Sequence, residues 1–273
     1  MKKKSLLERA AAAPHIAWSI MFIVAPMLFV LYFAFTDADG HFSFANIASL
    51  SQYSNVFFLS VAFALIATVV CLLIGYPLAY FMAKSSPKLR RVLIVLLMLP
   101  MWCNLLIRTY ALMALLDNGG LLNSMFEAMH LPKLHIVGSN FGVILGMVYD
   151  FLPYMVLPIY TVMTKLDNRY IEAAYDLGCN RFTTITKVVF PLTVSGVVSG
   201  VTMVFVPSIS TFYISQKLGA GKIDLIGDTI ERLFQNTNNY NVGAAISLVM
   251  MVLIIISILV MNKFSDNDGG IVI

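Results

Sequence analysis

Two charged residues, Arg108 and Asp150, lie inside long apolar stretches of the sequence. A charge in such a stretch needs a partner or water, so each marks a position where chemistry is possible. Tyr154 follows Asp150 by one helical turn, and Tyr149 and Trp102 add aromatic surface. A carboxylate among aromatic rings suits an ammonium group, because ammonium also binds ring faces. The pattern leaves two interpretations open: a structural Arg108–Asp150 ion pair, or an Asp150 that meets a cationic molecule in a pathway.

The remaining reactive residue types do not form the pattern of an enzyme or a metal site. The three cysteines have no C-x-x-C spacing, the four histidines are scattered, and no H-E-x-x-H occurs. The string most similar to a phosphate-binding loop is Gly219-Ala220-Gly221-Lys222. It lacks the first glycine of that motif, and Ile223 replaces the Ser or Thr. We therefore expect no catalytic residue, metal or cofactor in this chain, and no ATP hydrolysis by it.

The composition excludes a soluble protein. Charged residues make up 12% of the 273 residues, against roughly 25% in an ordinary globular chain. Residues of the types AVILMFWYC make up 59%, and the 19 Phe and 12 Tyr exclude a disordered chain. A membrane protein with several spans is the class that remains.

Six apolar runs are long enough to cross a membrane. About 20 residues are needed to cross the hydrocarbon layer, and each run must be helical because unpaired backbone groups are costly in lipid. The runs cover residues 16–35, 57–83, 92–116, 141–163, 188–213 and 242–261. We expect an all-α, polytopic membrane protein with six transmembrane helices in a single domain over residues 1–273.

The distribution of positive charge predicts the orientation. Thirteen of the 18 Lys and Arg residues lie in the two tails and in alternate loops, which face the cytoplasm when both termini do. They are Lys2, Lys3, Lys4, Arg9, Lys84, Lys88, Arg90, Arg91, Lys165, Arg169, Arg181, Lys187 and Lys263. We therefore expect both termini in the cytoplasm. In this orientation Arg108 and Asp150 lie at similar depths, roughly 12–14 Å below the outer boundary, which permits them to pair.

One of the cytoplasmic loops, residues 164–187, is too long for a simple turn. Asp167 or Asn168 can cap a helix over residues 169–177, and Gly178 supplies the backbone freedom needed where that helix ends. A second short helix follows. The loop therefore predicts two short helices joined at a sharp corner on the inner face of the membrane.

The same loop resembles the "EAA" loop of the permease subunits of ABC importers, whose pattern is E-A-A-x3-G-x9-I-x-L-P. The matching residues are Glu172, Ala173, Ala174, Gly178 and Pro191, while Val188 and Phe190 replace the usual Ile and Leu. The resemblance implies a type I permease fold and a coupling helix that docks on a separate ATPase subunit. Without the resemblance, an amphipathic helix lying on the membrane with no partner would explain the loop.

Other stretches resemble the spermidine/putrescine permeases of the PotB type. They include L-P-M-W-C-N-L-L-I-R-T-Y in the third run, V-Y-D-F-L-P-Y-M-V-L-P-I-Y in the fourth, and K-L-G-A-G-K-I-D-L-I-G-D-T-I before the last. These similarities extend over residues 73–243. They imply polyamine transport, and the candidate path residues are then Trp102, Tyr149, Asp150 and Tyr154.

The resemblance also implies the partners and the location. We expect two ATPase subunits that bind ATP, a second permease subunit, an external substrate-binding protein and membrane lipid, in a bacterial cytoplasmic membrane and without nucleic acid. Related ABC permeases for ferric iron are an alternative. A secondary transporter would need inverted repeats, of which we find no convincing example, and a membrane enzyme would need more buried titratable groups.

Overall fold

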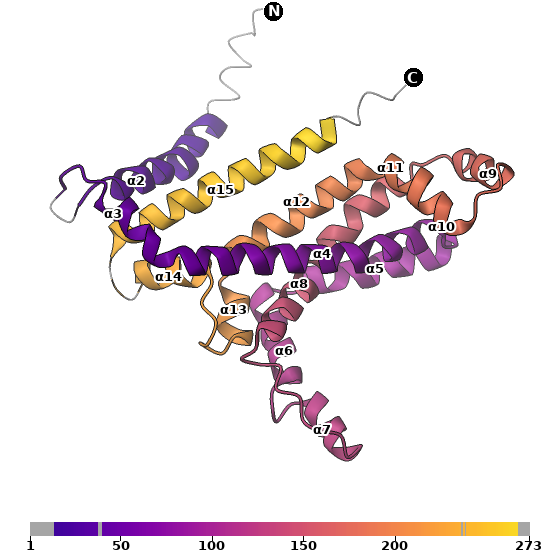
Figure 1. The fold of residues 1–273 in the computed structure, drawn as a ribbon, viewed down its shortest axis with the longest axis horizontal. Helices are drawn as coiled ribbons and strands as arrows, with labels where there is room; N and C mark the ends of the chain where they lie inside the picture. The colour runs from indigo at the N-terminus through magenta and orange to yellow at the C-terminus, as the bar shows by residue number, and fades with distance from the viewer. Residues whose placement is uncertain (1–13, 38–39, 236, 238, 267–273) are drawn as a thin grey trace, which may run out of the picture. The chain divides into compact units, whose positions relative to one another are not determined.

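The computed structural model describes residues 14–37, 40–235, 237 and 239–266 (Figure 1). Four of the cations that support the predicted orientation, Lys2, Lys3, Lys4 and Arg9, lie outside the described residues. In the described ranges the chain forms helices and no strand, so the predicted all-α class is confirmed.

The helices follow one another along the chain with short connections. In order they are η1 (Ile20–Val24), α2 (Ala25–Ala34), α3 (Ala45–Ala48), η2 (Ser49–Tyr53), α4 (Ser54–Lys84), α5 (Pro87–Trp102), α6 (Leu105–Leu116), α7 (Leu121–Ala128), α8 (Asn140–Met163), α9 (Asn168–Asp176), α10 (Arg181–Thr184), η3 (Ile185–Val189), α11 (Phe190–Leu192), α12 (Val194–Ser210), α13 (Tyr213–Leu218), α14 (Ile226–Gln235) and α15 (Tyr240–Asp266). Here η2 is a 3₁₀-helix, and η1 and η3 are π-helical turns.

Several of these helices are long and apolar enough to cross a membrane. Among the described residues there are five: Pro14–Ala34, Ala45–Lys84, Leu105–Ala128, Asn140–Met163 and Tyr240–Lys263. A sixth is present if the bent pair Arg181–Leu192 and Val194–Ser210 forms one span. The architecture is therefore that of a multi-span helical membrane protein.

The expected helix over residues 92–116 is interrupted. Helix α5 ends at Trp102 and α6 begins at Leu105, with Cys103 and Asn104 in extended backbone conformation between them. The side chain of Asn104 accepts a hydrogen bond from the N–H of Leu106 at 2.8 Å, so it caps α6. Asparagine favours this capping position over a helix interior, so the side chain stabilises the start of a new helix at this point.

The run over residues 188–213 is also divided. Its helical segments meet at Thr193 with a bend of 73°, and α12 ends at Ser210 before α13 begins. Pro191 cannot donate a backbone hydrogen bond, so the sequence contains one cause of this irregularity.

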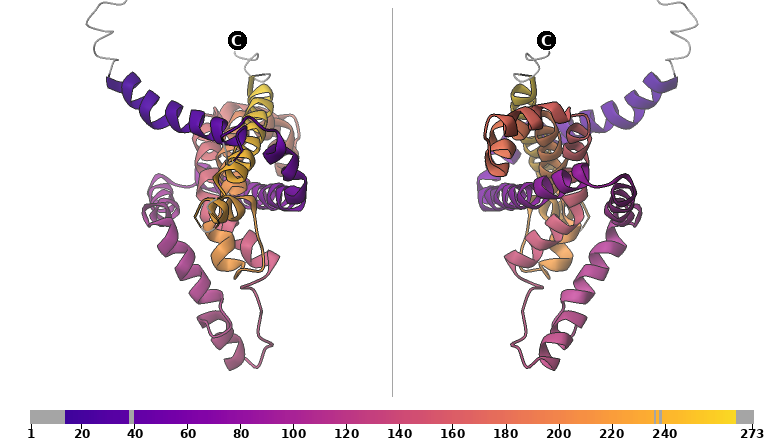
Figure 2. Two further views of the ribbon diagram at one scale, coloured as in Figure 1. Left: turned by 90° about the vertical axis from the view of Figure 1, so that its left-hand side faces the viewer. Right: turned by 90° about the vertical axis from the view of Figure 1, so that its right-hand side faces the viewer.

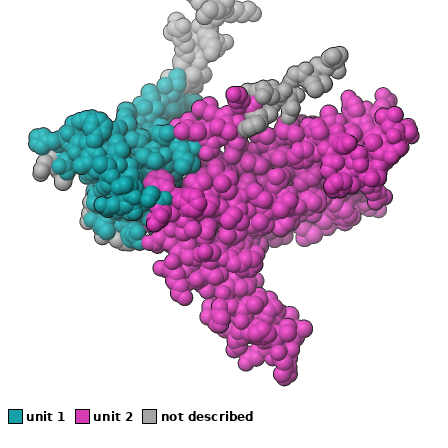
Figure 3. Space-filling view, in the orientation of Figure 1, with its two compact units in different colours: residues 1–54, 229–253 teal, residues 55–228, 254–273 magenta. Residues whose placement is uncertain are grey.

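The chain forms two compact units, which Figure 3 distinguishes by colour. Unit 1 comprises residues 1–54 and 229–253, and unit 2 comprises residues 55–228 and 254–273. The small core of unit 1 is built around Ala34, Ala244 and Ala245, which are buried. Short side chains there allow the helix backbones to approach closely.

Unit 2 has the larger core, and Met155 of α8 lies at its centre. Met155 is fully buried. A Cβ atom added to Gly75 of α4 would lie 3.0 Å from Met155 Cγ, and one added to Gly200 of α12 would lie 2.8 Å from its Sδ. Glycine on both neighbouring helices therefore makes room for Met155 and joins α4, α8 and α12 into one packed block. In contrast, α6 and α7 form an arm that leaves these helices (Figures 1 and 2).

Candidate functional site

The loop that resembles the EAA motif folds as two helical segments at one end of unit 2 (Figure 1). Asp167 caps α9 by accepting a hydrogen bond from the N–H of Arg169 at 3.0 Å. Gly178 ends the segment with a φ of +80°, and a Cβ atom there would meet nothing within 4 Å. Glycine is thus needed for the backbone conformation and not for space.

The residues of the motif face in different directions. Ala174 is buried and packs inward, whereas Glu172, Ala173 and Gly178 are exposed. Of the two alanines of the motif, only Ala173 is exposed on α9 and available to a partner. Ala174 and Ile171, three residues apart, instead hold the helix against its own chain.

Large apolar side chains of the same loop, which no sequence motif singles out, are exposed as well. Leu177 is 85% exposed and Phe182 is 76% exposed, and Tyr170 is also exposed. Large apolar groups exposed in a loop that also carries polar residues are typical of a contact surface for another protein. The sequence offers one indication of these residues: they lie within a few positions of Glu172 and Gly178, before and after the turn at Gly178.

Arg108 and Asp150 lie together in unit 2 and are almost completely buried. Arg108 Nε is 2.5 Å from Asp150 Oδ1, and the Thr109 hydroxyl donates to Asp150 Oδ2 at 3.2 Å. Arg108 Nη1 also donates to the carbonyl oxygen of Pro100 at 3.1 Å, and Nη2 donates to the backbone oxygen of Asp150 at 3.4 Å. The arginine therefore connects α5, α6 and α8 at the point where the run over residues 92–116 is interrupted.

In this network the negative charge of Asp150 is balanced by Arg108 and is therefore not available to a cationic substrate. Asp150 Oδ1 forms the ion pair with Arg108, and its Oδ2 shares the Thr109 hydroxyl with the carbonyl oxygen of Leu105. The Arg108 guanidinium lies 5.9 Å from the centroid of the Tyr149 ring. Trp102 is 74% exposed at the end of α5 and so does not share the buried environment of Asp150. The structure therefore places Tyr149 and Asp150 with Arg108. Trp102 is not part of this buried group, because its side chain is exposed.

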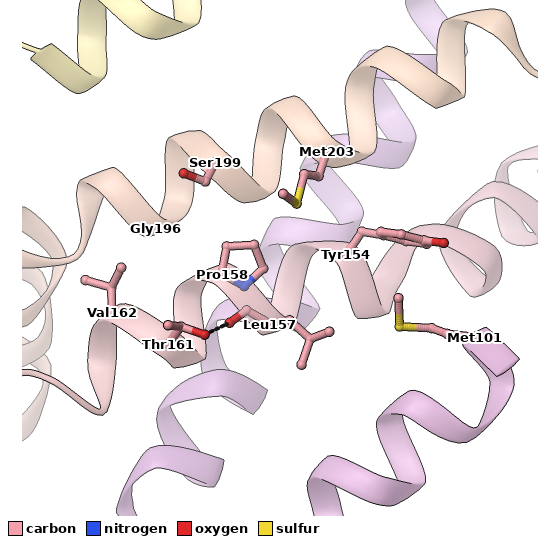
Figure 4. Close-up of a pocket in the computed structure, with 9 residues that line it drawn as sticks. All are labelled: Met101, Tyr154, Leu157, Pro158, Thr161, Val162, Gly196, Ser199 and Met203. Atoms are coloured by element: carbon pink, nitrogen blue, oxygen red, sulfur yellow. Dashed lines mark hydrogen bonds between the residues drawn. The ribbon is translucent and has the colours of Figure 1, made fainter. Parts of the chain in front are cut away.

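Tyr154, the fourth candidate path residue, lines a groove of about 520 Å³ between α5, α8 and α12 (Figure 4). Its lining residues are Met101, Tyr154, Leu157, Pro158, Thr161, Val162, Gly196, Ser199 and Met203. None of these is charged, and most of the wall is apolar.

Two of the polar residues of the groove, Thr161 and Ser199, offer hydroxyl oxygens as hydrogen-bond acceptors. The Thr161 hydroxyl donates to the backbone oxygen of Leu157 at 2.8 Å, and the Ser199 hydroxyl donates to that of Ser195 at 2.8 Å. Since each hydroxyl proton is used within its own helix, the oxygen lone pairs remain for a donor. Pro158 has no N–H, so it cannot pair the carbonyl oxygen of Tyr154 one turn earlier. An apolar groove with acceptors of this kind suits an aliphatic molecule that carries N–H donors.

The string most similar to a phosphate-binding loop does not have the structure of one. The segment Gly219–Lys222 is a turn in which Ala220 and Gly221 have positive φ, and the next helix, α14, begins only at Ile226. Within the described parts of the chain, no three His, Cys, Asp or Glu side chains cluster as metal ligands would.

The Arg108–Asp150 pair yields a stability prediction. Neutralising one member, as in Arg108→Gln or Asp150→Asn, leaves the other charge buried, and we expect a loss of about 3–5 kcal/mol. The double variant removes both charges, so its loss should be smaller than the sum of the single losses. Thermal unfolding of the purified protein measures this. Asp150→Asn with unaltered unfolding but weak uptake would instead assign the carboxylate to the path.

Comparisons with known proteins agree on one family. Residues 75–267 match the binding-protein-dependent transport system inner membrane component family. The chain is 37% identical over 263 residues to the spermidine/putrescine transport system permease protein PotB of Haemophilus influenzae, covering 93% of this chain and 92% of that protein. It is 34% identical over 255 residues to the protein of the same name from Escherichia coli, covering 90% and 93% of the two chains.

A solved structure supports the fold. The bacterial alginate ABC transporter, in complex with an alginate pentasaccharide-bound periplasmic protein, matches with a TM-score of 0.77 at 19% identity, covering 95% of this chain and 93% of that one. The chain belongs to the binding-protein-dependent transport system inner membrane component family, and it is a multi-pass permease subunit of an ABC importer of the bacterial inner membrane.

Proposed function

We propose that this permease imports polyamines of the spermidine and putrescine type. The observation that carries the proposal is the 37% identity to a spermidine/putrescine permease over almost the whole of both chains. The groove beside Tyr154 supports it, because its apolar wall fits methylene segments and its oxygen acceptors fit ammonium donors. The acceptors are neutral, so each holds an ammonium group weakly, which suits a path that must release its cargo.

The importer has further subunits in this proposal. Two ATPase subunits bind the ATP, a second permease completes the path, and a binding protein delivers the substrate from outside. Both termini and α9 face the cytoplasm, where the ATPases are. Nucleotide-driven closure of the ATPases then moves the coupling helices and switches the path between inward-facing and outward-facing states.

Helix α9 is the contact with the ATPase in this proposal. Glu172 and Ala173 are exposed on α9, and the same loop exposes the apolar side chains of Leu177, just after α9, and of Phe182 in α10. An apolar patch with one charge provides contact area together with a group that sets register. Gly178 contributes through the angle of the corner and not through direct contact. The Arg108–Asp150 pair stabilises the permease and leaves the groove as the candidate path.

The substrate is tested by uptake into vesicles that contain the complete complex. We expect ATP-dependent uptake of labelled spermidine or putrescine that is competed by the unlabelled polyamine and not by ferric iron. Uptake of iron without uptake of either polyamine would contradict the proposal and support the related iron permeases as relatives in function.

Charge reversal on α9 tests the coupling contact. Glu172→Lys should reduce uptake by more than about tenfold, because a wrong charge at a protein interface costs several kcal/mol. The amount of protein in the membrane should be unchanged, since Glu172 is exposed. Glu127→Lys in α7 is the matched control, because its partner Lys133 is also exposed and such pairs contribute little. Normal uptake by the Glu172 variant would contradict the coupling role.

Two substitutions at Tyr154 test the groove. Tyr154→Phe keeps the ring face and should retain most uptake, whereas Tyr154→Leu removes it. We expect Leu to lower the apparent affinity for polyamine by about two- to thirtyfold, the range of one cation–π contact. Equal uptake by both variants, at normal amounts of protein in the membrane, would exclude Tyr154 from the path.

A further inference from the structure

The bend at Thr193 is held by side-chain hydrogen bonds. The N–H of Thr193 bonds to the carbonyl oxygen of Phe190 at 3.1 Å, three residues back, and so departs from the regular α-helical pattern. The Thr193 hydroxyl donates instead to the carbonyl oxygen of Val189 at 2.9 Å. Thr193 is fully buried, so these bonds have no competition from water. A hydroxyl side chain thus supplies the bond that the bent backbone gives up.

Tyr76 of α4 completes this arrangement. Its hydroxyl oxygen lies 3.1 Å from Thr193 Oγ1. Either hydroxyl can be the donor in this contact, and Tyr76 is the donor when the single Thr193 hydroxyl proton goes to Val189. The ring of Tyr76 also lies 5.5 Å from that of Phe190, the apolar position just before the motif's proline. Tyr76 therefore contacts the bend with both its ring and its hydroxyl.

The same face of α4 contacts the beginning of the coupling segment. Tyr76, Tyr80 and Lys84 are spaced by four residues and so lie along one side of the helix. Lys84 Nζ donates to Asn168 Oδ1 at 2.6 Å, at the first residue of α9. Helix α4 is thus bonded to both ends of the segment over residues 168–193.

Beyond the bend, α12 has little freedom to move alone. A Cβ atom at Gly196 would lie 3.0 Å from the backbone oxygen of Pro158, and one at Gly200 would lie 3.0 Å from that of Met155. These close approaches between α8 and α12 make the two helices a rigid pair. Any change in the angle between the coupling segment and this pair must therefore occur near Thr193.

We propose that Tyr76 is a positioning residue for energy coupling: its hydroxyl fixes the pivot at Thr193, so that displacement of the coupling segment is passed to α4 and to the α8–α12 pair. The proposal rests on the role of α9 given under Proposed function. Tyr76 takes no part in binding the substrate or the ATPase. It determines how far the movement of the segment reaches into the spans.

Removal of one hydroxyl tests this in the purified complex with its ATPase and binding protein in vesicles. Tyr76→Phe keeps the ring contact and should lower the number of substrate molecules transported per ATP by about two- to tenfold, the factor set by one ordinary hydrogen bond. ATP hydrolysis itself should persist. Thr193→Ser keeps the hydroxyl and should behave like the native chain. Tyr80→Phe is the matched control, since no hydrogen bond of the Tyr80 hydroxyl occurs among the described residues.

The outcomes separate coupling from stability. An unchanged ratio of transport to hydrolysis in Tyr76→Phe would overturn the proposal, as would a fall in transport and hydrolysis together with loss of the bound ATPase. Glu172→Lys, assayed in parallel, distinguishes the underlying assumption. If Glu172→Lys transports normally, the proposed role of α9 is wrong. If Glu172→Lys is inactive and Tyr76→Phe is normal, only the proposed role of Tyr76 is wrong.

Discussion

The backbone groups at each interruption of a membrane-spanning helix must find partners, because water is scarce there and an unpaired group costs several kcal/mol. This requirement accounts for polar residues at two places in the apolar runs. At the interruption between α5 and α6, Asn104 caps the new helix and Arg108 binds the carbonyl oxygen of Pro100. At the bend before α12, the Thr193 hydroxyl binds the carbonyl oxygen of Val189. Each of these side chains bonds a backbone group at or near a place where the chain departs from a regular helix.

The buried ion pair follows from the same requirement. Arg108 serves the interrupted backbone, and its charge must itself be balanced, which Asp150 does from the neighbouring helix. The carboxylate is consequently occupied before any substrate arrives. The proposed polyamine path then depends on neutral acceptors such as those of the groove beside Tyr154. Weak, distributed acceptors favour passage, whereas a free buried carboxylate would hold a polycation too strongly to release it.

The sequence predicts features that depend on local chemistry. Helix α8 follows the apolar run over residues 141–163, and α9 follows its Asp167 cap and ends before Gly178. The interruption at Asn104 was not predicted, because one polar residue in an apolar run is as compatible with a continuous helix as with a cap. The inward direction of Ala174 depends on what α9 packs against, and the Tyr76–Thr193 contact joins residues 117 positions apart. Such features are set by tertiary packing, for which a single sequence carries no local signal.

The two kinds of contact in unit 2 differ in how readily they can be broken. Contacts through Gly75, Gly196 and Gly200 bury surface along whole helices, so separating them would expose large apolar area. The contact of Tyr76 with Thr193 is a single hydrogen bond, worth about 1 kcal/mol, which thermal motion breaks and reforms. A transporter that alternates between two conformations needs rigidly packed helices that transmit a displacement, and weak contacts that allow the displacement to be reversed. The glycine contacts provide the first, and the hydroxyl groups at the bend provide the second.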